Sequence, residues 1–167
     1  MPRLRPLLLA LLLLSGLRAA EPQAGLAVTF TAAGKSDVRS DRLLALYVPA
    51  GQAPTPFLPA GPFVAKWEGR ILSPVRGTFT FAAENSGGFK LSLNGQPLLD
   101  GATARTITLN QGENTLVAEL PSAAQGDTFV RLTWSSKDFL PEPVPPTVLA
   151  HTPAEAELAA TRVREGR

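Results

Sequence analysis

Residues 63–81, FVAKWEGRILSPVRGTFTF, decide the fold because their apolar and polar side chains alternate. In the first half, Phe63 and Trp67 fall on one side of an extended chain, and lysine and glutamate fall on the other. A period of two is typical of a β-strand that is buried on one face only. After a turn the second half repeats this pattern, with Phe79 and Phe81 in the same alternation. We therefore expect two consecutive half-buried strands.

Segments of the same kind continue on both sides of this stretch. Residues 89–93 alternate, and Asn94 and Gly95 then form the dipeptide typical of a two-residue hairpin turn, in which both residues need positive φ. Residues 84–88 are interpreted as the tip of an earlier hairpin. Further candidate strands are residues 26–30, 43–48, 105–109, 115–120 and 128–134, with turns at residues 110–112 and 125–127. This pattern predicts an all-β fold, an antiparallel β-sandwich or barrel.

Two proline-rich segments interrupt the alternation. Residues 49–62 hold five prolines in fourteen positions, and residues 141–146 follow the last candidate strand with a similar composition. Proline has no N–H to donate to a sheet, so both segments are expected to be extended surface loops. Val144, and Val148 with Leu149, could still lie along a sheet edge.

The composition of the 167 residues predicts one domain and excludes several kinds of site. The chain is 44% hydrophobic and 18% charged, which is sufficient for a single core. Because cysteine is absent, the chain cannot form a disulfide, a thiolate zinc site, a cysteine nucleophile or a covalent c-type haem attachment. The single histidine, His151, is expected at the surface and without a functional partner.

The N-terminal residues 1–20 resemble a secretory signal peptide. Two arginines precede an unbroken apolar run at residues 7–14, and the small residues Ala19 and Ala20 follow at the expected cleavage point. A run of eight residues is too short to span a bilayer of about 30 Å, so a retained membrane anchor is the less favoured alternative. We expect an exported, secreted or periplasmic, protein.

Removal of these residues changes the net charge of the chain. Three of the sixteen basic residues lie within residues 1–20, which leaves 13 basic and 14 acidic side chains in the mature chain. No basic stripe with interleaved aromatic residues and no basic amphipathic helix remains. Neither nucleic acid nor, after signal cleavage, a membrane is an expected partner.

The sequence divides into three parts. Residues 1–20 form the signal peptide, residues 25–152 the β-domain, and residues 153–167 a helical linker or tail rich in alanine, glutamate, leucine and arginine. The tail has too few apolar residues for a core of its own. It resembles the stretch that leads into a haem c domain in multidomain exported proteins, although no haem-attachment motif is present.

Several motifs resemble those of the carbohydrate-associated β-sandwich domain named after anthrax protective antigen. The family's motifs correspond in order to residues 67–71 (WEGRI), 77–81 (GTFTF), 94–95 (NG), 98–100 (LLD), 132–136 (LTWSS) and 142–146 (EPVPP). The resemblance extends over about residues 25–151. It implies the protective-antigen type of antiparallel β-sandwich and an association with glycans.

The resemblance also implies where a ligand would bind. Calcium-dependent members carry two adjacent aspartates after the GTFTF-like strand, and the ion then chelates sugar hydroxyls. Here Ser86 and Gly87 occupy those positions, preceded by Glu84 and Asn85. A serine hydroxyl and a bare backbone do not replace two carboxylates as ligands of a hard cation. These four residues are candidate ligand contacts, and no metal or other cofactor is expected.

Other conspicuous residues have structural explanations. Trp67 and Trp134 could stack on sugars, but their places in alternating strands favour the core. Asp100 follows an apolar pair at a strand end, where a turn-capping carboxylate is expected. No GxSxG, HExxH or phosphate-binding loop follows a strand, so no catalytic residue is predicted and an enzyme is the weakest hypothesis.

Two functions remain for the sequence. The first is an exported non-catalytic module that binds carbohydrate or cell-envelope polysaccharide. The alternative is a structural accessory domain of a larger exported enzyme or haem c electron-transfer protein, truncated after Arg167, whose partner would be a downstream domain or another protein.

Overall fold

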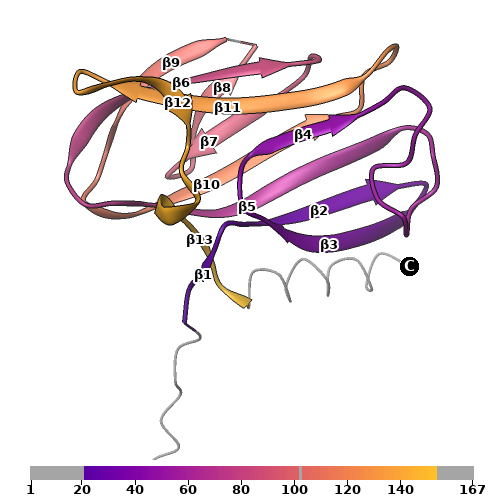
Figure 1. The fold of residues 1–167 in the computed structure, drawn as a ribbon, viewed down its shortest axis with the longest axis horizontal. Helices are drawn as coiled ribbons and strands as arrows, with labels where there is room; N and C mark the ends of the chain where they lie inside the picture. Colours follow the sequence, from indigo (N-terminus) through magenta and orange to yellow (C-terminus); the bar gives the residue numbers. More distant parts are fainter. Residues whose placement is uncertain (1–20, 102, 154–167) are drawn as a thin grey trace, which may run out of the picture.

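The computed structural model describes residues 21–101 and 103–153, which are built almost entirely of β-strands (Figure 1). Besides the strands, these ranges contain the short 3-10 helix Pro146–Val148, and residue 153 is helical. No helix in the described ranges has the length and apolar character needed to cross a bilayer. The predicted signal peptide, residues 1–20, and the predicted helical tail, apart from residue 153, lie outside the described residues.

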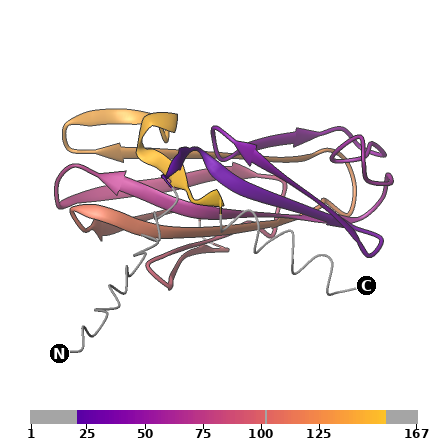
Figure 2. The same ribbon diagram turned by 90° about the horizontal axis from the view of Figure 1, so that it is seen from below.

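Two antiparallel sheets make up the fold. The eight-stranded sheet contains β1 (Gln23–Ala24), β2 (Leu26–Ala32), β3 (Lys35–Asp41), β5 (Phe63–Ser73), β7 (Lys90–Leu93), β8 (Gln96–Asp100), β10 (Gly112–Pro121) and β13 (Leu149–His151). The five-stranded sheet contains β4 (Ala45–Val48), β6 (Gly77–Asn85), β9 (Ala104–Leu109), β11 (Thr128–Ser136) and β12 (Phe139–Pro143). Figure 2 shows the strands in layers. The predicted all-β antiparallel fold is confirmed.

The core lies between the inward faces of the two sheets. The strands β5 and β6, which form the stretch from which the fold was predicted, alternate between buried and more exposed residues along their length. Trp67 on β5 is fully buried, and Trp134 on β11 stacks on Phe79 with ring centroids 5.0 Å apart. The core interpretation of both tryptophans is therefore confirmed. Removal of such large apolar surfaces from water stabilises the fold.

Residues 84–88 are not a hairpin tip, as the sequence had suggested. The strand before them, β6, pairs with β9 and β11 in one sheet, whereas the next strand, β7, pairs with β8 and β10 in the other. The connection at residues 86–89 therefore crosses from one sheet to the other. Alternation along a strand shows that one face is buried, but it does not identify the neighbouring strand.

Besides the two-residue β1, two edge strands were missed in the sequence. Strand β3 contains a single apolar residue, Val38, because it pairs only with β2 and leaves most of its side chains half-buried or exposed. Strand β12 includes Pro141 and Pro143, which were expected in a loop. An edge strand tolerates proline because one side of its backbone needs no sheet partner. The other proline-rich segment, residues 49–62, is a loop as predicted.

His151 is buried, which corrects the expected surface position. Its side chain lies on β13, which pairs with both β1 and β5, and only 1% of the residue is exposed. One ring nitrogen, Nδ1, lies 3.1 Å from the carbonyl oxygen of Gly25, and Nε2 lies 3.0 Å from Ser40 Oγ. The imidazole thus connects β13 to Gly25 near the start of the described chain and to Ser40 on β3, and both of its ring nitrogens have polar partners.

The predicted hairpin turn between β7 and β8 is confirmed. The φ angles of Asn94 and Gly95 are 52° and 74°, as a type I′ turn requires. The Asn94 side chain also accepts a hydrogen bond from Thr115 N and donates one to Asn114 Oδ1, both at 2.9 Å. Asn114 is fully buried and also bonds the backbone of Asn110. These amides tie the turn to β10.

Candidate functional site

Three connections lie together at one end of the sandwich, which we call the loop end. They are residues 49–62, 86–89 and 122–127. The strand register places them there, because Val48 pairs with Thr128 and the next residues of β11 pair with the end of β6. Pro121, at the end of β10, pairs with Val64 near the start of β5. Connections between strands of both sheets therefore lie side by side at the loop end.

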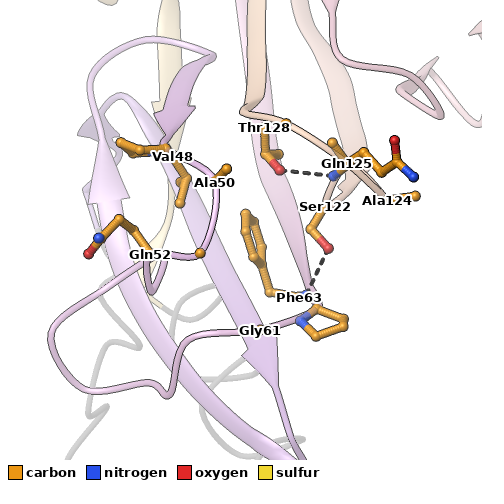
Figure 3. A pocket seen from close by; sticks show the side chains of 14 residues that line it. Val48, Ala50, Gln52, Gly61, Phe63, Ser122, Ala124, Gln125 and Thr128 are labelled. Atoms are coloured by element: carbon orange, nitrogen blue, oxygen red, sulfur yellow. Dashed lines mark hydrogen bonds between the residues drawn. The ribbon is translucent and has the colours of Figure 1, made fainter.

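A pocket of about 370 Å³, the end pocket, opens between residues 49–62 and residues 122–127. Figure 3 shows the ring of Phe63 between the two loops. The hydroxyl of Ser122 accepts a hydrogen bond of 3.1 Å from Phe63 N, and the hydroxyl of Thr128 accepts one of 2.8 Å from Ala123 N. Both hydroxyls hold the pocket walls in place. The remaining lining is mainly glycine, alanine, proline, exposed backbone and the amides of Gln52 and Gln125.

The Tyr47–Asp127 hydrogen bond joins the rims of the two loops. The Tyr47 hydroxyl donates to Asp127 Oδ2, and Ala50 N donates to Asp127 Oδ1 at 2.9 Å. The Tyr47 hydrogen bond is the main cause that lowers the pKa of Asp127, and the Ala50 N–H adds to this effect. The same hydrogen bond raises the pKa of Tyr47. Ionised Asp127 therefore fixes the start of the proline-rich loop.

Three of the four predicted contact residues form one turn at the loop end. Asn85 Oδ1 accepts a hydrogen bond of 2.8 Å from Gly87 N. Ser86 exchanges two hydrogen bonds with Phe129, accepting at Oγ from the backbone N at 3.1 Å and donating its own N–H to the carbonyl at 2.9 Å. The polar side chains of this turn therefore already have partners within the protein.

The fourth predicted residue, Glu84, lies apart from this turn. It is an exposed residue on β6, directly across from Arg131 on β11. Together with Tyr47 and Phe129 it lines a shallow depression on the five-stranded sheet. Within residues 21–101 and 103–153, no group of three or more acidic or histidine side chains could hold a metal ion. The donor set at residues 84–87 does not fit a calcium ion, which needs several oxygen ligands.

The predicted turn and the end pocket adjoin each other. Gly88 has a φ of +73°, and a Cβ atom there would lie 2.7 Å from Pro121 Cγ. Pro121 immediately precedes Ser122, which lines the end pocket. The absence of a side chain at residue 88 thus lets the turn pack against the pocket wall.

The contribution of residues 49–62 and 122–127 was missed in the sequence. Asp127 was recognised only as part of a turn, and Phe63 only as a strand residue. The five prolines were the available signal, because long ordered loops in compact domains are often functional. A further signal in the sequence was Phe57, the aromatic residue within this proline-rich segment. In the structure 79% of Phe57 is exposed.

The chain is similar to a known domain family and to several solved structures. A family model described as the PA14 domain matches residues 48–138. This match begins at the last residue of β4 and ends in the turn after β11. It includes all three loop-end connections, residues 49–62, 86–89 and 122–127. No curated protein is similar enough to match the chain.

Solved structures resemble the fold at low sequence identity. An anti-sigma factor domain-containing protein from Clostridium clariflavum is 20% identical with a TM-score of 0.65, over 76% of this chain and 47% of that one. The PA14 domain of the MpAFP antifreeze protein is 11% identical with a TM-score of 0.67, over 79% and 93%. The PA14 sugar-binding domain of an RTX adhesin is 16% identical with a TM-score of 0.62, over 77% and 98%. The chain thus spans about half the length of the first relative and nearly all of the other two.

Proposed function

Because this chain belongs to the PA14 domain family, we propose that it is an exported, non-catalytic module that binds carbohydrate or cell-envelope glycan at its loop end. We equate this family with the domain named after anthrax protective antigen, on the motifs found in the sequence. The observation that carries the proposal is the end pocket of about 370 Å³, bordered by the predicted contact turn. The sugar-binding domain of the RTX adhesin supports the same ligand class.

The chemistry of the loop end suits a neutral sugar. Phe57 lies on the 49–62 loop outside the lining of the end pocket, and Tyr47 lines the neighbouring shallow depression with Glu84. The two residues expose 79% and 65% of their surface, and such rings pack against the apolar face of a pyranose. The amides of Gln52 and Gln125 each combine a donor and an acceptor, which matches vicinal hydroxyls. We propose that the Asn85–Gly87 side of the rim contributes backbone groups, and that Glu84 contacts only a longer glycan.

Binding at this site is proposed to be independent of calcium. Asn85 and Ser86 already use their side-chain oxygens in internal hydrogen bonds, and the carboxylate of Glu84 lies on the outer sheet face. A calcium ion at the turn would therefore have to displace these contacts. The sugar is held instead by direct hydrogen bonds and by aromatic contact.

A glycan array with the purified protein, with added calcium and with a chelator, tests this proposal. Saturable binding is expected to be equal in both conditions. Phe57→Ala is expected to weaken it about threefold to tenfold, since an aromatic contact contributes about 0.5–1.5 kcal/mol. The matched control is Leu140→Ala, which removes an exposed apolar side chain from β12. The proposal is contradicted if no glycan is bound, or if Phe57→Ala and Leu140→Ala weaken glycan binding equally. Loss of glycan binding in the chelator contradicts calcium independence.

The alternative function is that of a structural accessory domain within a larger exported protein. The internal hydrogen bonds of Asn85 and Ser86 favour it, because they leave fewer polar groups for a ligand. In that case no glycan in the array is bound, and the double variant Asn85→Ala/Ser86→Ala alters only thermal stability. Sequencing of the DNA beyond the codon for Arg167 tests whether a further domain follows.

Export is proposed from residues 1–20. Expression of the whole gene in a secreting host, followed by mass spectrometry of the product, tests it. Cleavage after Ala19 or Ala20 is expected. A product that retains its N-terminal residues would contradict this part of the proposal.

A further inference from the structure

A second and larger cleft lies at the end of the sandwich opposite the loop end. We call it the turn-end cleft. Its volume is about 930 Å³, and it opens between residues 74–76, the turn from β5 to β6, and residues 137–138, the turn from β11 to β12. The register of β6 and β11 separates the two sites, because Thr80 pairs with Ser135 here whereas Asn85 pairs with Val130 at the loop end.

Three aromatic rings form the walls of the turn-end cleft. Phe79 and Trp134 are stacked at 5.0 Å with an interplanar angle of 11°, and the Phe139 ring centroid lies 5.5 Å from that of Trp134. The indole Nε1 of Trp134 donates to Glu142 Oε1 at 3.3 Å, so the polar edge of this ring is occupied. Val75, which is 58% exposed, extends the apolar surface to the mouth. The walls therefore favour an apolar guest.

The rim of the turn-end cleft carries positive charge. Arg76 and Lys137 are exposed, and neither makes an ion pair with any side chain in the described part of the protein. One carboxylate, that of Asp138, lines the same rim. The carboxylate of Glu142, which accepts from Trp134 Nε1, lies outside the lining of the cleft. Among the lining residues, two cations against one anion leave a net positive rim next to an apolar interior, which is complementary to an anion with an apolar body.

A neutral sugar fits this cleft poorly. Two of the three serines that line it have internal partners, since Ser73 Oγ donates to Val75 O at 2.7 Å and Ser136 Oγ accepts from Asp138 N at 3.0 Å. Between these apolar walls, a polyhydroxylated ring would meet few free hydrogen-bonding groups for the hydroxyls that it buries, which is costly. We propose that the turn-end cleft binds a small carboxylate with an aromatic body, whose ring contacts Phe139 and Trp134 and whose charge faces Arg76 and Lys137.

The test compares two ligands of nearly equal shape, 3-phenylpropionate and its neutral amide, 3-phenylpropionamide. Each is titrated into the isotope-labelled full chain and followed by amide chemical shifts. The shifts are expected around residues 73–80 and 134–139, and the carboxylate is expected to bind about fivefold more tightly than the amide, as for one exposed charge pair. No binding of either ligand, or shifts confined to the loop end, would overturn the proposal.

Two pairs of variants separate charge from shape. Arg76→Gln/Lys137→Gln is expected to abolish the preference for the carboxylate, whereas the control Lys35→Gln/Arg42→Gln, which removes the same charges from exposed positions elsewhere, leaves it unchanged. Val75→Glu places a carboxylate at the mouth and is expected to weaken 3-phenylpropionate binding at least about tenfold, whereas Val75→Gln has a smaller effect. If Arg76→Gln/Lys137→Gln kept the same preference for the carboxylate over the amide as Lys35→Gln/Arg42→Gln, the proposed role of the rim would be overturned. Glycan binding at the loop end is unaffected by any of these variants.

Discussion

At the residue scale, the hydrogen bond between Tyr47 and Asp127 makes the loop end sensitive to acid. The lowered pKa of Asp127 means that the folded protein favours the ionised form. Its stabilising contribution is therefore present above the ordinary value of 3.8 and is lost as the pH falls through the lower, folded-state pKa. NMR titration of the Asp127 carboxyl carbon is expected to give a midpoint below 3.8. In Tyr47→Phe the midpoint is expected to rise, and an unchanged midpoint would contradict this assignment.

Trp67 illustrates how one residue carries much of the core. Its side chain is fully buried, and Phe30 is also fully buried on the neighbouring strand β2. Trp67→Ala is expected to lower the free energy of unfolding by about 3–5 kcal/mol, because it removes buried apolar surface and leaves a cavity. Chemical denaturation measures this loss. Leu140→Ala, at an 85% exposed residue, is the control and should cost much less; similar losses would contradict the expected contribution of Trp67 to stability.

At the element scale, the close approach of β13 to β5 depends on Gly69. A Cβ atom at this position would lie 2.6 Å from the carbonyl oxygen of Ala150 and 2.7 Å from Leu26 Cδ2. Gly69→Ala is therefore expected to force β13 away from β5 and to destabilise the protein by about 1–3 kcal/mol. Denaturation of this variant tests the contact. The exposed Glu119→Ala on β10 is the control, and a neutral effect of Gly69→Ala would show that β13 can shift without cost.

At the scale of the whole molecule, we expect thermal stability to be insensitive to calcium. A ligand that binds only the folded state raises the melting temperature by mass action, and the described residues contain no cluster of metal ligands. Calorimetry with millimolar calcium and with a chelator should therefore give the same Tm. A rise in Tm with calcium would show a site in a geometry different from that of residues 84–87. The variant Glu84→Gln would then indicate whether its carboxylate takes part.

Local patterns allowed much of the fold to be predicted. The alternation at β5 and β6, the Asn94–Gly95 turn and the burial of Trp67 each depend on the chemistry of a short segment, and each was recognised. The edge strand β3 was missed because an edge needs few apolar side chains. At the candidate site, the polar character of residues 84–87 was visible in the sequence, but the neighbouring end pocket was not.

The amino-acid sequence alone determined the β class, the inward-facing positions and the chemical character of the predicted contact turn, because these depend on periods and residue types within a few positions. Only the folded chain decided which strands share a sheet, why His151 is buried, and which loops meet at each end. Contacts such as that between Tyr47 and Asp127 join residues far apart in sequence. Their formation depends on strand pairing across the whole domain, for which a single sequence contains no local signal.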